Sequence, residues 1–174
     1  MKTESRPVSF PMDPSTTSIA VGAQWIRDHL KGGSTCPCCT QLAKRYKRKL
    51  NSSMAYALVL IYRAFRGERQ EWLHVPDYLT EVCRTGPTIR GGDWAKLVHW
   101  GLIEPKSDEI RSDGSKRVGF YRITQRGRDF VEGRIRVPQH VLIYAERCMG
   151  TSEETTSLEE ALKDRFNFRE LMDA

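Results

Sequence analysis

The stretch from Asp93 to Val131 decides the fold class of this chain. It begins DWAKLVHWGLIEP (Asp93–Pro105), continues through a charged interval that contains a glycine, and ends RVGFYRITQRGRDFV (Arg117–Val131). The first part predicts a helix that ends at Gly101, with a strand after it. The interval predicts a hairpin turn, and the last part predicts a return strand and a capped helix. The stretch therefore indicates helix, strand, turn, strand and helix.

Hydrophobic periodicity and capping residues predict further elements on both sides of this stretch. Helices are expected at Ile19–Leu30, Met54–Phe65, Pro76–Cys83 and Ser157–Met172. Strands are expected at Glu71–Val75 and Val137–Tyr144. The fold class predicted from these elements is α+β and mainly helical.

Two of the expected helices carry distinctive signals. Met54–Phe65 is apolar nearly all round, which predicts a position at the centre of the core, and Ser52 and Ser53 are its expected caps. Ser157 with Glu160 forms a capping-box pattern before the last helix, whose apolar residues share one face.

The order of elements over Met54–Ile123 is that of a winged helix-turn-helix domain. The residues Lys96-Leu97, Gly101-Leu102-Ile103-Glu104 and Phe120-Tyr121-Arg122-Ile123-Thr124-Gln125-Arg126-Gly127 resemble regulators of the MarR and PadR type. In those families a similar LxxxGLI and YxLTxxG run joins the reading helix to the wing. The resemblance spans residues 54–131 and implies binding to double-stranded DNA, without catalysis, in a regulatory role.

The sequence divides into four parts on this interpretation. Residues 1–18 are rich in Pro, Ser and Thr and predict a flexible arm. Residues 19–50 hold the first helix, a cysteine segment and a basic segment. Residues 51–135 are the expected winged-helix domain, and residues 136–174 are expected to form a strand and an acidic amphipathic helix.

Charge is unevenly distributed over the 174 residues. The net charge is +6, but Met149–Ala174 carries seven acidic and three basic residues, so the rest of the chain carries +10. A basic body favours a polyanionic partner, because phosphate contacts supply most non-specific affinity for nucleic acid. A solvated basic surface is the alternative.

The sequence also bears on location and source. No apolar run approaches the ~20 residues that span a membrane, and the first residues have no signal-peptide core. We expect a cytoplasmic protein of a bacterial or phage-infected host cell, and the combination of segments resembles a small phage-encoded protein.

Cations in three segments are the candidate nucleic-acid contacts. The densest run is KRYKRK, with five cations and one tyrosine. The other two segments are the expected reading helix with its approach, and the expected wing. The candidates are Lys44, Arg45, Lys47, Arg48, Lys49, Arg90, Lys96, His99, Arg111, Lys116 and Arg117.

The expected reading helix contains two tryptophans, which is unusual for a surface that reads bases. Ala95, Val98 and Leu102 are expected to face the core. Trp94 and Trp100 either pack in the core as well or dock on a protein. The second alternative, together with the apolar Leu158–Leu171 face of the last helix, predicts a different function, a phage-type interaction module that inhibits a host nucleic-acid-binding or defence enzyme.

Three of the five cysteines lie close together in STCPCCT. Cys36 and Cys39 have the two-residue gap of a zinc knuckle, and Cys148 with His140 are the expected remaining ligands. His74 and Cys83 are further candidates, and a reduced loop without metal is the alternative. No paired-carboxylate pattern, Gly-rich phosphate loop or HExxH is present, so we expect a protein that is not an enzyme.

Overall fold

The computed structural model describes residues 17–66, 71–84, 89, 91–106, 118–163 and 166–173. The fold is α+β, as predicted, with antiparallel strand pairs and with more residues in helices than in strands among those described. The chain forms two compact units. Unit 1 contains residues 17–48 together with Leu142–Gly150, and unit 2 contains Lys49–Val141 together with Thr151–Ala174. No helix within the described ranges is both long and apolar enough to cross a membrane.

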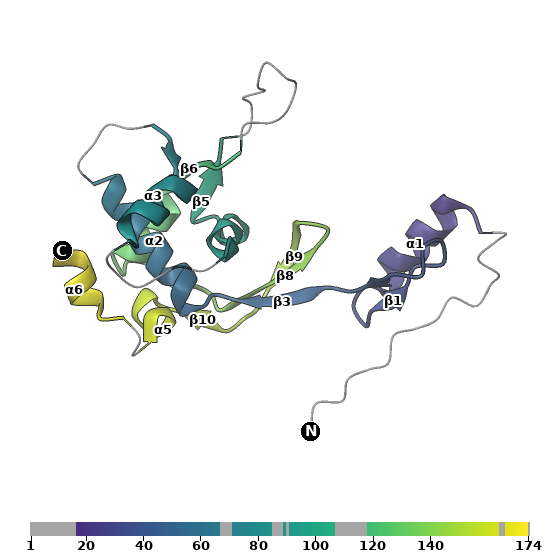
Figure 1. Cartoon of the computed structure of the whole chain (residues 1–174). Helices are drawn as coiled ribbons and strands as arrows, with labels where there is room; N and C mark the ends of the chain where they lie inside the picture. Colours follow the sequence, from purple (N-terminus) through teal and green to yellow (C-terminus); the bar gives the residue numbers. More distant parts are fainter. Residues whose placement is uncertain are drawn as a thin grey trace, which may run out of the picture. The chain divides into compact units, whose positions relative to one another are not determined.

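Helix α2 (Ser52–Ala64) is the centre of unit 2 (Figure 1). Every residue from Met54 to Tyr62 is buried, as its apolar character predicts. Burial on all sides follows because other helices pack against it, among them α3 (Val75–Val82), the 3₁₀ helix η2 (Asp93–Trp100), α4 (Gln125–Val131) and α5 (Leu158–Leu162). The expected caps were wrong by one or two residues: the side chain of Asn51 accepts a hydrogen bond from the backbone N–H of Met54 at 3.0 Å.

A small antiparallel sheet in the order β4-β6-β5 lies in the same unit. Its strands are β4 (Leu73–His74), β5 (Ile103–Pro105) and β6 (Phe120–Ile123). Helix α3 (Val75–Val82) and the 3₁₀ helix η2 (Asp93–Trp100) come between β4 and β5 in the chain. All of these elements were predicted, although β4 is shorter than the expected strand.

The YRITQRG segment joins β6 to α4 (Gln125–Val131) through a close backbone approach. The Thr124 hydroxyl accepts from the backbone N–H of Gly127 at 3.0 Å and donates to the carbonyl of Gly101 at 2.6 Å. A Cβ on Gly127 would lie 2.1 Å from the carbonyl oxygen of Leu102. The glycine of this motif is therefore required because α4 packs directly on the backbone before β5.

The C-terminal segment differs from its prediction in two ways. The expected strand 137–144 is two strands, β7 (Val137–Pro138) and β8 (His140–Tyr144), which belong to different sheets, and β7 pairs with β10 (Thr155–Thr156). The expected helix 157–172 is also two elements, α5 (Leu158–Leu162) and α6 (Phe168–Asp173). Lys163 has a positive φ of 55°, which no α-helix can continue through.

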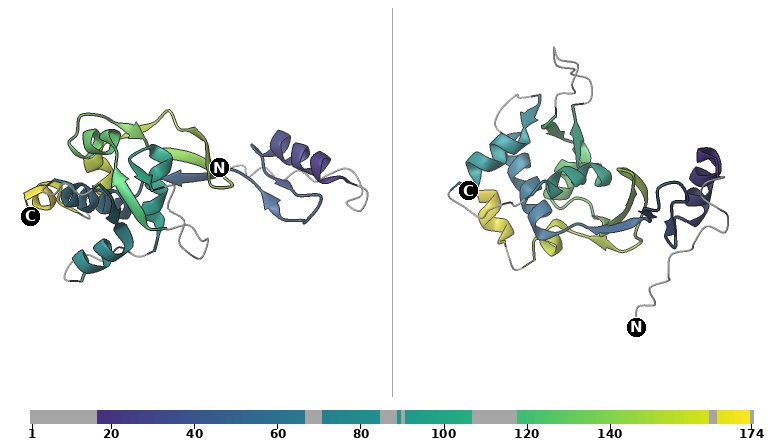
Figure 2. Two further views of the ribbon diagram at one scale, coloured as in Figure 1. Left: turned by 90° about the horizontal axis from the view of Figure 1, so that it is seen from above. Right: turned by 45° about the vertical axis from the view of Figure 1, so that its right-hand side comes forward.

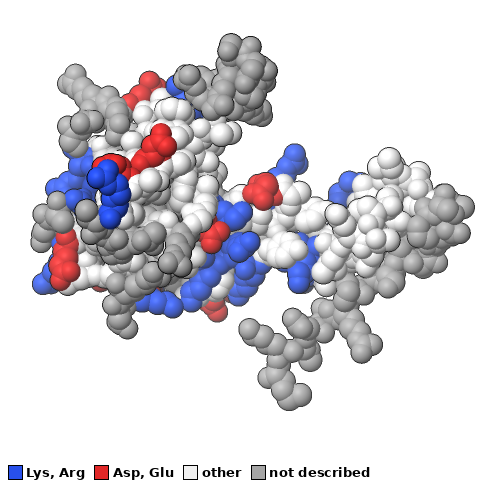
Figure 3. Space-filling view, viewed as in Figure 1, with Lys and Arg blue, Asp and Glu red and all other residues white. Residues whose placement is uncertain are grey.

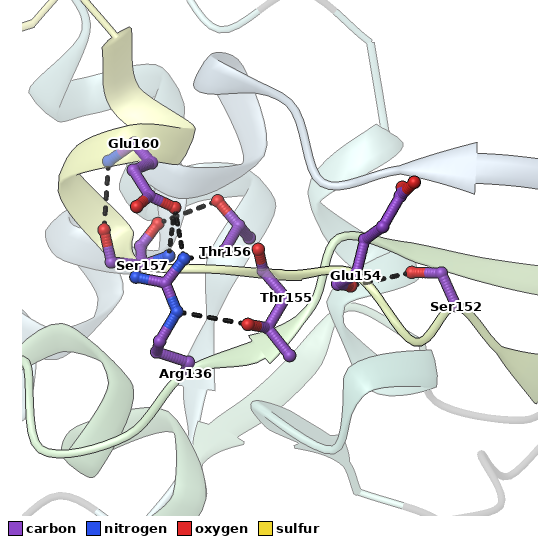
Figure 4. A network of polar contacts seen from close by, with 7 residues as sticks. All are labelled: Arg136, Ser152, Glu154, Thr155, Thr156, Ser157 and Glu160. Atoms are coloured by element: carbon purple, nitrogen blue, oxygen red, sulfur yellow. Dashed lines mark hydrogen bonds and ion pairs between the residues drawn. The ribbon is translucent and has the colours of Figure 1, made fainter.

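A polar network around Arg136 fixes the start of α5 (Figure 4). The Arg136 guanidinium lies 2.7 Å from the Glu160 carboxylate and donates to the hydroxyl of Thr155 at 3.1 Å. Ser157 and Glu160 form the capping box that the sequence predicts. Arg136 first, and the backbone N–H of Ser157 next, lower the pKa of Glu160.

Unit 1 contains a helix, a hairpin and most residues of a sheet of three further strands. Helix α1 (Ile19–His29) lies beside the hairpin of β1 (Ser34–Thr35) and β2 (Leu42–Ala43), as Figures 1 and 2 both show. The sheet has the order β3-β8-β9, in which β3 is Tyr46–Lys49 and β9 is Arg147–Thr151. Of these strands, only the segment of β8 was predicted.

Candidate nucleic-acid interface

The basic run forms the edge strand β3 and the turn before it. Lys47, Arg48 and Lys49 are exposed on β3, Lys44 is exposed in the turn, and Arg45 is half-buried. The Lys44 ammonium lies 5.7 Å from the centroid of the Tyr46 ring. The cations of this run were predicted as nucleic-acid contacts, whereas no role was predicted for Tyr46. An aromatic side chain among cations is the sequence signal that could have indicated such a role.

The reading-helix candidate is a 3₁₀ helix, and this changes which side chains face the core. Trp94, Leu97 and Trp100 recur every three residues, so a helix with three residues per turn aligns them on one buried face. The Trp100 indole N–H donates to the carbonyl of Pro138 at 2.7 Å. Trp94 packs edge-on against Tyr121, with ring centroids 5.0 Å apart. Core packing therefore accounts for both tryptophans.

The other faces of η2 carry its polar residues. Lys96 and His99 are half-buried and three residues apart, so they share a face, as expected. Leu102 is fully buried, also as expected. Ala95 and Val98 were expected to face the core, but both are only half-buried. That expectation was wrong because it assumed the 3.6 residues per turn of an α-helix, whereas a 3₁₀ helix has three.

A cation-aromatic cluster lies beside the β4-β6-β5 sheet, and sequence reasoning missed it. The Arg122 guanidinium lies 4.6 Å from the centroid of the Trp72 ring, and the Lys106 ammonium lies 5.9 Å from it. Glu104, on the neighbouring strand, forms an ion pair with Arg122. The cluster follows from cross-strand pairing, which residue spacing alone does not reveal. The wing candidates Arg111, Lys116 and Arg117, with Arg90, lie outside the described residues.

The CPCC segment forms a tight turn between β1 and β2. The backbone N–H of Cys36 donates to the carbonyl of Gln41 at 2.8 Å, and that of Thr40 donates to the carbonyl of Cys36 at 2.9 Å. Hydrogen bonds from the backbone of Cys39, and then of Cys38, lower the pKa of the Cys36 thiol. This turn returns Cys36 and Cys39 to the same end of the hairpin.

The remaining metal-ligand candidates are divided between the units. Cys148 lies on β9 in unit 1 and is exposed. His140 belongs to unit 2, where its Nδ1 lies 3.9 Å from the Glu154 carboxylate, and His74 has its Nδ1 2.7 Å from the carboxylate of Asp77. Within the described ranges, no group of three or more His, Cys, Asp or Glu side chains is placed to hold a metal ion.

A pocket of about 540 Å³ lies between α3 and the approach to η2. Leu79, Ile89 and Trp94 give it apolar walls, and Cys83 is also exposed to it. Its described lining includes no histidine or carboxylate side chain that would serve as a base for Cys83.

Comparisons with protein-family models, with curated proteins and with solved structures found no match to this chain.

Proposed function

We propose that residues 51–135 form a winged helix-turn-helix domain and that the protein binds double-stranded DNA in a regulatory, non-enzymatic role. The observation that carries the proposal is the element order α2, β4, α3, η2, β5, β6, α4 with the sheet order β4-β6-β5. In a winged helix, the helix before the hairpin enters the major groove, and the hairpin contacts the backbone.

The polar residues of unit 2 suit this docking. In the proposed complex Lys96 and His99 face the duplex from η2, since the opposite face of that helix is buried in the core. Lys106 follows β5 and adds positive charge at the base of the proposed wing, next to the Arg122–Glu104 ion pair. Most of the affinity would come from phosphate contacts, so binding would weaken as salt rises.

A protein-interaction module that inhibits a host enzyme is the second function that the sequence suggested. Two sequence features within unit 2 favoured this function, namely the tryptophan pair and the apolar face of the last helix. Trp94 and Trp100 are 8% and 4% exposed, and Leu158 and Leu162 are buried as well. These residues stabilise the core, so they do not supply a docking surface, and we favour the duplex.

We also propose zinc as a structural cofactor of unit 1, bound by Cys36 and Cys39. The CxxC turn fits half of a tetrahedral thiolate site. Four of the five cysteines, namely Cys36, Cys38, Cys39 and Cys148, belong to unit 1. Since His140 belongs to unit 2, we leave it out of this ligand set. Zinc would cross-link the two ends of the CPCC turn, and no catalytic role is assigned to it.

The test of duplex binding is fluorescence anisotropy of a labelled DNA duplex over a series of salt concentrations. We expect the logarithm of the association constant to fall linearly with the logarithm of salt concentration, and Lys96→Glu to reduce that slope by about one phosphate contact. Arg169→Glu is the matched control, because it makes the same charge change on the exposed face of α6. Absence of binding at low salt would overturn the proposal.

A further inference from the structure

Strand β3 is an exposed edge strand, and its composition needs an explanation. All four residues, Tyr46–Lys49, are exposed, and β3 lies at one end of the β3-β8-β9 sheet. Side chains alternate along a strand, so Tyr46 and Arg48 share one face while Lys47 and Lys49 share the other. Cations on an edge strand protect it from pairing with other chains. Protection accounts for the lysines, but it does not account for an exposed tyrosine among them.

Tyr46 is placed as a stacking platform. Its side chain is 50% exposed, and the Lys44 ammonium lies 5.7 Å from its ring centroid. Tyrosine usually buries its ring when the fold needs it for packing. A ring that stays half in solvent with cations before and after it in the chain has the composition that proteins use to stack a base and pair the adjacent phosphates.

The charge of unit 1 matches such a ligand. The described residues of unit 1 include seven basic side chains and two acidic ones. The acidic residues are Asp28 and Glu146. The basic residues are Arg27, Lys31, Lys44, Arg45, Lys47, Arg48 and Arg147. Figure 3 shows Lys and Arg gathered where β3 lies. A polyanion that also presents flat apolar faces satisfies both the charge and the exposed ring.

We infer that β3 binds single-stranded nucleic acid, with the Tyr46 ring stacked on an unpaired base and the phosphates contacted by Lys44 and Arg48. A single strand is required because the faces of bases in a duplex are already covered by their neighbours. The inference rests on the proposed nucleic-acid partner and adds single-stranded nucleic acid as a second form of it.

The experiment compares single-stranded and duplex binding by the full-length protein. Labelled oligodeoxythymidine and oligouridine of about 15 nucleotides are the single-stranded probes, a length that covers the usual site sizes. We expect Tyr46→Ala to weaken single-strand binding by about 5- to 100-fold, Tyr46→Phe to retain it, and duplex binding to change by less than about twofold. Met149→Ala, which removes a side chain of similar exposure from β9, is the matched control and is expected to change neither affinity.

The outcomes separate this inference from the proposed function. Duplex binding without single-strand binding overturns the inference and leaves the winged-helix proposal standing. Single-strand binding that depends on Tyr46, without duplex binding, supports the inference and overturns the winged-helix proposal. Single-strand binding that Tyr46→Ala leaves unchanged, or an equal loss on both probes, overturns the inference. Absence of binding to every probe overturns both proposals. The preference between the two single-stranded probes shows whether the ligand is DNA or RNA.

Discussion

Unit 2 and unit 1 place their apolar side chains in opposite ways. Nearly all buried apolar residues of the described chain belong to unit 2, and unit 1 contributes Leu30, Pro37, Ala43 and Ile143. The large exposed apolar residues show the reverse: all but Val118 belong to unit 1, namely Ile19, Val21, Leu42, Tyr46 and Met149. Unit 2 therefore buries its apolar side chains in a core, whereas unit 1 exposes many of its own to solvent.

The difference indicates that the two units are stabilised by different means. Burial around α2 supplies the main favourable free energy for unit 2. A unit of a few tens of residues with so few buried apolar side chains generally needs a cross-link or a metal. Unit 1 is also where four of the five cysteines lie, which is the physical reason for expecting a metal there.

The largest expected effect is that of metal removal on unit 1. A chelator, or the substitution Cys39→Ser, should remove one zinc ion per chain. Loss of the ion should lower the free energy of unfolding by about 10 kcal/mol. Limited proteolysis should then cleave unit 1 and spare unit 2. Elemental analysis with native mass measurement gives the zinc content. Cys83→Ser, in unit 2, should retain the ion. Zinc-free protein with a protease-resistant unit 1 would contradict this account.

A smaller effect is expected from adding a methyl group at Gly127 in unit 2, where the backbone lies close to that of Leu102. Gly127→Ala should destabilise the protein by at least about 2 kcal/mol, because the new Cβ meets the backbone of Leu102 and the side chain of Ile123. Urea denaturation measures the change. The control is Gly92→Ala, where a Cβ would have no heavy atom within 4 Å and φ is −93°, so the cost should stay under about 1 kcal/mol. Equal costs would show that the contact at Gly127 does not constrain α4.

The smallest effect concerns the exposed network at the start of α5. Hydrogen bonds from Arg136 and from the backbone of Ser157 lower the pKa of Glu160 below its ordinary value of 4.5 in the folded state. A lowered folded pKa contributes stability that is present above the ordinary pKa and is lost as pH falls through the folded pKa. Glu160→Gln should therefore flatten the loss of stability below about pH 4.5 in a urea-midpoint titration. Glu159→Gln, on the same helix, is expected to leave that pH dependence unchanged.

Much of the fold could be predicted where the signal is local. The bounds of η2 match the helix expected at Asp93–Trp100, since Asp93 begins it and Gly101 ends it with a left-handed φ of 68°. Thr124 and Ser157 cap the helices that they were expected to cap. Each signal depends on one or two residues and their neighbours within a single turn, so it can be read without knowing the fold.

The parts that were not predicted depend on distant partners. Strand β3 consists almost entirely of cations, so its pairing with β8 has no hydrophobic alternation to reveal it. The cluster at Trp72 forms only when β6 pairs with its neighbours. The three-residue period of Trp94, Leu97 and Trp100 is visible in the sequence, but long 3₁₀ helices are uncommon, so this period alone does not identify one.

The central claim, that unit 2 docks on duplex DNA through η2 and the segments beside it, is tested most directly by hydrogen exchange with and without DNA. The full-length protein is compared at low salt, free and saturated with duplex. We predict slower amide exchange over residues 91–106 in the complex and unchanged exchange in α6. Protection confined to α6, or no protection over residues 91–106 when DNA is bound, would contradict the account.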